Sequence, residues 1–98
     1  MTLTTDKNGT NLTVHLNGEL NTMTAPELSA LLNKELSGVQ ALTLDFKECD
    51  YVSSAGLRVL LATFKQMKAA KGSMSLANVG ENFRAVLENT GLDAVFGI

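Results

Sequence analysis

Hydrophobic residues in this chain follow two spacings that alternate along the sequence. Leu12, Val14 and Leu16 recur at every second position, which is typical of a strand with one buried face. Leucines between residues 28 and 36 recur at intervals of three and four, which is typical of an amphipathic helix. Strand-like spacing returns at 41–46 and 73–77, and helix-like spacing returns at 57–67 and 83–87. This alternation favours an α/β fold in which helices connect the strands.

Turn-forming residues mark the boundaries of these segments. Asn8-Gly9 predicts a hairpin that pairs roughly Thr2–Asp6 with Thr10–Asn17. Thr24 is an N-cap candidate for the first helix, because Glu27 follows it three positions later. The three helices are expected to end at Gly38, Gly72 and Gly91, and residues 92–98 are expected to form a short closing element.

The order of these segments predicts a two-layer α/β fold with a mixed sheet of about four strands. Helical crossovers require the second, third and fourth strands to be parallel, and the N-terminal hairpin adds an antiparallel edge. The strands alternate between apolar and polar residues, so the helices should cover mainly one face and leave His15 on a solvent-facing one. We expect residues 1–98 to form a single domain.

Charge and composition exclude several classes of function. The net charge of −2 provides no basic surface for nucleic acid or an anionic membrane, so neither contact is expected. Cys49 has no partner for a disulfide and should pack as a small hydrophobe. The chain shows neither a leader nor an apolar run of membrane-spanning length, which predicts a cytoplasmic protein. It has no nucleotide-binding glycine motif and only one histidine, so no cofactor or metal is expected.

The adjacent serines Ser53 and Ser54 lie on a predicted turn between a strand and a helix. The first amides of a helix lack intrahelical partners, so a hydroxyl there could either cap the helix or carry a phosphate. Loops that leave the carboxyl ends of parallel strands meet at one edge, here 18–23, 49–56 and 78–80. No histidine or lysine is near enough in sequence to activate a serine, so an enzyme is not expected. Asp45, Glu48 and Asp50 are interpreted as a solvated loop edge.

Three segments together resemble the STAS domains of bacterial anti-sigma factor antagonists, and the resemblance runs nearly end to end. They are Gly18-Glu19-Leu20-Asn21, Leu42–Phe46 and Tyr51–Leu61. The resemblance implies that the phosphate acceptor is the serine two positions before Gly56, namely Ser54. Ala55 takes the place of a neighbouring hydroxyl in that family.

The family resemblance also implies a regulatory cycle. The unmodified protein would bind an anti-sigma factor serine kinase and release a sigma factor, and phosphorylation of Ser54 would end the binding. A serine phosphatase is the further expected partner. The residues expected to contact the partner are Asn21, Thr22, Ser53, Ser54, Ala55, Gly56, Arg58, Asn78 and Gly80.

Ser53 and Asn21 stand where this family commonly has aspartates. The loss of both carboxylates makes the loop edge less acidic and leaves an alternative open. In that alternative the chain is a non-phosphorylated STAS binding subunit of a lipid-transport ATPase or of a signalling complex.

Overall fold

The computed structural model describes residues 1–98 and contains four strands and four helices. They are β1 (Thr2–Asn8), β2 (Asn11–Asn17), α1 (Ala25–Glu35), β3 (Ala41–Glu48), α2 (Ser54–Ala69), β4 (Ser73–Ala77), α3 (Glu81–Thr90) and α4 (Leu92–Phe96). The predicted order of strands and helices is confirmed, and the closing element is the short helix α4.

The four strands form one mixed sheet in the order β1-β2-β3-β4. β1 pairs with β2 in the antiparallel sense, while β2, β3 and β4 are mutually parallel. The hairpin turn places Gly9 at a φ of 64°, a conformation that glycine adopts without strain. The sheet predicted from the sequence is therefore confirmed, including the antiparallel edge.

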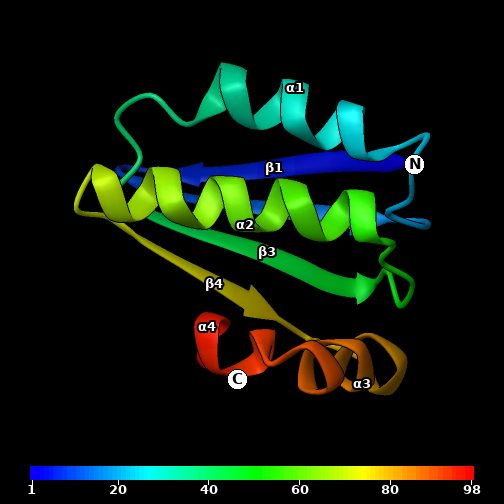
Figure 1. Cartoon of the computed structure of the whole chain (residues 1–98). Coiled ribbons are helices and arrows are strands. Elements are labelled where there is room, and N and C mark those ends of the chain that lie inside the picture. The colour runs from blue at the N-terminus through cyan, green and yellow to red at the C-terminus, as the bar shows by residue number, and fades with distance from the viewer.

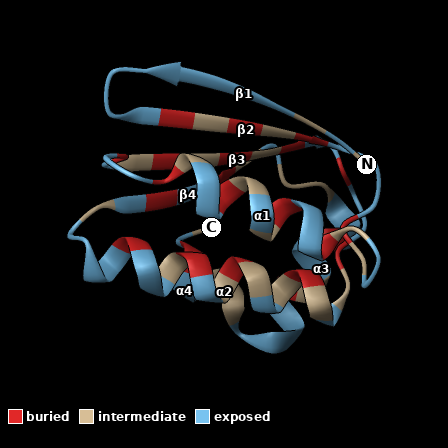
Figure 2. Cartoon of the chain, turned by 90° about the horizontal axis from the view of Figure 1, so that it is seen from above, coloured by how far each residue is buried: buried red, intermediate tan, exposed pale blue.

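The helices cover one face of the sheet and leave the other face open (Figures 1 and 2). On the covered face Leu12, Val14 and Leu16 are at most 1% exposed, as are Leu42 and Leu44. Each such side chain contributes about 1.5–3 kcal/mol through burial. The open face carries the polar alternates of the same strands, such as Thr13, His15, Thr43 and Asp45. The two-layer, one-sided arrangement is confirmed.

Two aromatic contacts hold the C-terminal helices in place. The rings of Phe46 on β3 and Phe83 on α3 have centroids 4.9 Å apart, which fixes α3 against the sheet. The rings of Phe64 on α2 and Phe96 on α4 meet edge to face at 5.6 Å. The first contact joins α3 to β3, and the second joins α4 to α2.

Some helix ends differ from the sequence predictions. Thr24 precedes α1 as expected, but its side chain makes no capping bond, because its hydroxyl oxygen accepts from the amide of Asn21 at 2.8 Å instead of from a helix amide. The hydroxyl itself donates to the carbonyl of Glu19 at 2.6 Å. α1 ends before Gly38, at the C-cap Leu36. Gly72 does not end α2 through a left-handed backbone, since Lys71 has the positive φ of 61°. A side chain at Gly72 would meet the carbonyl of Gln40, so close packing explains this glycine. Gly91 ends α3 as predicted.

Candidate functional site

Two of the three predicted loops are joined by backbone hydrogen bonds at the carboxyl ends of the parallel strands. The amide of Leu20 donates to the carbonyl of Tyr51 at 2.9 Å, and the amide of Ser53 donates to the carbonyl of Leu20 at 2.8 Å. Leu20 and Val52 thereby form an isolated parallel bridge beyond the sheet. Figure 1 shows these loops and the β4–α3 loop at the same end of the molecule. We call this surface, residues 18–24, 49–56 and 78–82, the loop edge.

Gly56 allows the start of α2 to pack closely on this bridge. A Cβ at Gly56 would lie 2.8 Å from Leu20 Cγ and 2.9 Å from Val52 Cγ1. Both neighbours are buried branched side chains with little room to move. The absence of a side chain at Gly56 therefore allows the serine turn to lie close to Leu20 and Val52.

The structure distinguishes the two serines, which the local sequence could not do. Ser53 is the N-cap of α2, and its Oγ accepts from the amide of Gly56 at 3.4 Å. Its carbonyl accepts from Leu57 at 2.9 Å, so the backbone of Ser53 is also fixed. Ser54 is the first residue of α2 and is exposed. Of the two hydroxyls, only that of Ser54 is both exposed and uninvolved in the cap.

The start of α2 is electrostatically open to an anion. The amides of Ser54 and Ala55 precede the first intrahelical hydrogen bond and have no backbone acceptor. The first turn of α2 contains no acidic residue. α2 is also the longest helix of the chain, with 16 residues. The partial positive charge of this helix end is therefore not balanced from within the helix.

Asn21 organises the loop between β2 and α1. Its Oδ1 accepts from the amides of Met23 at 2.9 Å and Thr24 at 3.1 Å. The hydroxyl of Thr24 in turn accepts from the amide of Asn21 at 2.8 Å. Asn21 is half-buried in this turn, whereas Thr22 at its tip is exposed. An aspartate oxygen at residue 21 could accept the same two amides, so the asparagine preserves the loop geometry.

Carboxylates hold the β4–α3 loop in place. Asn78, at a φ of 56°, donates its side-chain amide to Asp45 Oδ1 at 2.8 Å. Asn82 donates to Asp50 Oδ2 at 2.7 Å. A side chain at Gly80 would collide with the carboxylate of Asp50. Asp45 and Asp50 are thus more than the solvated loop edge expected from the sequence, because each binds a specific amide in the β4–α3 segment.

The remaining predicted contact residues lie near the start of α2. Ala55 is half-buried, and Arg58 is exposed one turn further along α2. Arg58 also lines a shallow groove of about 170 Å³ between α1 and α2. Eight of the nine predicted contact residues therefore lie on the loop edge, and Arg58 follows directly on α2. Their role in binding stays a prediction.

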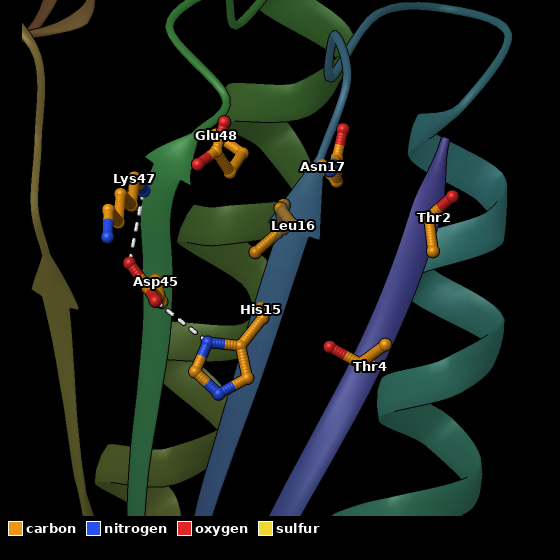
Figure 3. A pocket seen from close by; sticks show the side chains of 8 residues that line it. All are labelled: Thr2, Thr4, His15, Leu16, Asn17, Asp45, Lys47 and Glu48. Atoms are coloured by element: carbon orange, nitrogen blue, oxygen red, sulfur yellow. Dashed lines mark hydrogen bonds and ion pairs between the residues drawn. The ribbon is translucent and has the colours of Figure 1, made fainter.

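A second polar site lies on the open face of the sheet (Figure 3). His15 Nδ1 lies 2.7 Å from Asp45 Oδ2, beside a pocket of about 370 Å³ that also contains Thr2 and Thr4. The hydrogen bond from Asn78 holds the pKa of Asp45 below its usual value and outweighs partial burial, and His15 and the amide of Lys47 act in the same direction. His15 and Asp45 are opposite each other in the β2–β3 register, which the strand alternation alone could have suggested.

The open-face site has few groups for chemistry. His15 Nε2 lies 4.0 Å from Asp6 Oδ2, and no group of three or more His, Cys, Asp and Glu side chains is arranged to hold a metal ion.

The single cysteine lies in the core, away from this face. Cys49 is 1% exposed, and burial raises the pKa of its thiol, so it is a poor nucleophile. None of the helices combines the length and apolar composition needed to cross a bilayer. The loop edge is therefore the stronger candidate.

Comparison with known proteins finds related sequences, two of which align with nearly the whole chain. A family model described as STAS domain matches residues 2–98. A Bordetella bronchiseptica protein assigned as the anti-sigma factor antagonist BtrV is 35% identical over 99 aligned residues, covering 100% of this chain and 85% of the relative. The anti-sigma-B factor antagonist of Bacillus subtilis is 30% identical, covering 94% of this chain and 84% of the relative.

Solved structures share the fold. An anti-sigma factor antagonist from Mycobacterium paratuberculosis superposes with a TM-score of 0.86 at 25% identity, covering 97% of this chain and 81% of that one. The unphosphorylated form of the anti-sigma factor antagonist SpoIIAA superposes with a TM-score of 0.82 at 18% identity, covering 99% and 98%. The phosphorylated form of SpoIIAA, a Bacillus protein, gives 0.77 at 19% identity, covering 95% and 86%.

Proposed function

This chain belongs to the STAS domain family, and we propose that it is an anti-sigma factor antagonist that works by partner switching. In its unmodified form it binds an anti-sigma factor serine kinase through the loop edge and so releases a sigma factor. The kinase then transfers the γ-phosphoryl group of ATP to Ser54, and the complex separates. Because sigma factors act in transcription, the proposed place of action is the cytoplasm.

The observation that carries this proposal is the position of Ser54. Its hydroxyl is exposed at the first residue of α2, beside two unpartnered amides and with no acidic residue in the first turn. A helix end of this kind favours a bound phosphate by about 0.3–1 kcal/mol. The domain can thus accept the modification without refolding.

A phosphate at Ser54 would act on the partner interface by charge and hydration. Phosphoserine carries roughly −1.5 to −2 charges and a bulky hydrated group, which opposes an interface formed around a neutral hydroxyl. A penalty of about 3 kcal/mol would lower the affinity roughly a hundredfold. A serine phosphatase would restore the binding form.

The relatives support this function by name, and the local departures are compatible with it. Both curated relatives are named anti-sigma factor antagonists, and SpoIIAA has the same fold in its unphosphorylated and phosphorylated forms. Ser53, where the family commonly has aspartate, still caps α2. Asn21 still accepts the two loop amides. Neither substitution removes the proposed acceptor hydroxyl of Ser54, which is exposed in this chain.

Intact mass after incubation with the cognate kinase and ATP tests the modification. The wild-type protein and Ser53→Ala are expected to gain one phosphoryl group, because the cap hydroxyl is not the acceptor. Ser54→Ala is expected to gain none. Phosphorylation that persists in Ser54→Ala and disappears in Ser53→Ala would assign the reaction to the other serine. No modification of any form would favour the non-phosphorylated binding subunit.

Binding to the unmodified kinase tests the switch. Ser54→Ala is expected to bind with wild-type affinity, and Ser54→Asp roughly a hundredfold more weakly, since the carboxylate imitates part of the phosphate charge. Isothermal titration calorimetry measures both constants, and circular dichroism checks that both variants keep the native fold. Equal affinities for the two variants would rule out a charge switch at this hydroxyl.

A further inference from the structure

The surface of the molecule exposes three large hydrophobic side chains, and two of them lie on the loop edge. Met23 is 81% exposed, Tyr51 is 52% exposed and Val95, on α4, is 41% exposed. Met23 and Tyr51 come from different loops, which are joined by the hydrogen bond from Leu20 to the carbonyl of Tyr51. Methionine and tyrosine are enriched in the buried centres of protein interfaces.

The backbone beneath each of these two side chains is fixed. The amide of Met23 donates to Asn21 Oδ1 at 2.9 Å, within the turn that Asn21 and Thr24 form. The carbonyl of Tyr51 accepts from Leu20 at 2.9 Å, and the thiol of the buried Cys49 approaches the same carbonyl at 3.6 Å. A fixed backbone lowers the entropic cost of docking, so these exposed side chains are arranged for an intermolecular contact.

The surroundings of Tyr51 are acidic. Tyr51 lines a cavity of about 440 Å³ together with Gly18, Glu19, Glu48, Asp50 and Asn82. The ion pairs within the chain involve only His15, so the three carboxylates of this cavity have no cationic partner. Charge complementarity therefore favours an occupant with basic side chains around the contact.

We infer that Met23 and Tyr51 are the apolar anchors of the loop edge, and that they dock on a partner surface with an apolar centre and a basic rim that faces Glu19, Glu48 and Asp50 rather than Ser54. This inference rests on the proposed function and assigns that surface to the anti-sigma factor. A second copy of this chain fits poorly. A symmetric contact through the same edge would bring Glu19, Glu48 and Asp50 against their own equivalents.

Truncation of the two anchors tests the inference directly. In titration calorimetry with the cognate anti-sigma factor, Met23→Ala and Tyr51→Ala are each expected to weaken binding about tenfold or more, as buried interface anchors do. Val95→Ala is the matched control, since it removes the third exposed hydrophobic side chain from outside the loop edge and should change the affinity less than about twofold. Thermal unfolding should show all three variants folded, because each side chain is largely or partly in solvent.

Neutralisation of the rim tests the charge complementarity. The double variant Glu19→Gln and Glu48→Gln is expected to slow association by about tenfold at low salt, and the difference should shrink as salt screens the charges. Glu35→Gln, in the last turn of α1, is the control and should leave the association rate unchanged. Equal rates for the double variant and the wild type at low salt would overturn the basic rim.

The outcomes separate this inference from the proposed function. Failure of the wild-type protein to bind any cognate anti-sigma factor would overturn both. Tight wild-type binding that Met23→Ala and Tyr51→Ala leave unchanged would overturn the anchors alone. Sedimentation in the absence of a partner gives the remaining outcome. A dimer that Met23→Ala dissociates would assign the surface to a second copy and overturn the inference.

Discussion

The starts of α2 and α3 lie at the same edge of the molecule but differ in the charged side chains beside them. At the start of α3, Glu81 lies in the first turn and the carboxylate of Asp50 packs against Gly80. At the start of α2 there is no acidic residue in the first turn, and a neutral serine, Ser53, provides the cap. One helix end already has negative charge beside it, and the other has none.

This difference indicates why one end suits a switch and the other suits a fixed support. Glu81 and Asp50 at the start of α3 balance the helix dipole permanently. Hydrogen bonds from Asn78 to Asp45 on β3 and from Asn82 to Asp50 in the β3–α2 loop hold this segment in place. At the start of α2 the same stabilisation remains available to a group that can be added and removed. A phosphate on Ser54 would supply it.

The largest expected effect comes from the two glycines at these helix starts. Gly56→Ala places a methyl group against buried Leu20 and Val52, which should lower the free energy of unfolding by about 1–3 kcal/mol. Gly80→Ala meets the Asp50 side chain, which is at the surface and can rotate away, so its cost should be smaller. Urea denaturation measures both. An equal or larger loss for Gly80→Ala would contradict the view that Gly56 is the more tightly packed position.

A smaller effect is expected from Asp45, which fixes the entry to α3. Asp45→Asn weakens the hydrogen bonds to Asn78 and His15 and should cost about 1 kcal/mol at neutral pH. Because folding lowers the pKa of Asp45, the charged form stabilises the native state above the pKa of the unfolded chain. The difference between wild type and variant should therefore shrink as the pH falls through the native pKa. A difference that stays constant between neutral and strongly acidic pH would contradict this assignment.

The smallest expected effects come from exchanging charge between the two helix starts. Ser53→Asp adds a carboxylate at the N-cap of α2 and should stabilise the fold by about 0.3–1 kcal/mol, while Asp50→Asn should destabilise it by a similar amount. Thermal unfolding at low salt measures both changes. Ser53→Asp should also slow phosphorylation of Ser54, because the positive end of the helix dipole is then already balanced by a carboxylate. An unchanged phosphorylation rate would show that the open dipole of α2 is not what the modification requires.

The sequence predicted elements whose signals are local. The alternation of Leu12, Val14 and Leu16 identified a strand and its buried face, and Asn8-Gly9 identified the hairpin. The capping role of Thr24 was wrong because the hydroxyl is used by the preceding loop, whose path depends on contacts outside the helix. Gly72 was misassigned for a related reason, since its constraint is the distant carbonyl of Gln40.

By itself the sequence determined the element order, the parallel sheet with its hairpin edge and the covered face, because these follow from the periodicity of adjacent residues. It also restricted the proposed phosphate acceptor to two neighbouring serines, and only the family resemblance selected between them. The tertiary structure decided which hydroxyl is exposed, which helix start lacks a carboxylate and which hydrophobic side chains remain in solvent. Those properties depend on long-range contacts, such as Leu20 with Val52 and Asp50 with Gly80, that join loops far apart in the chain.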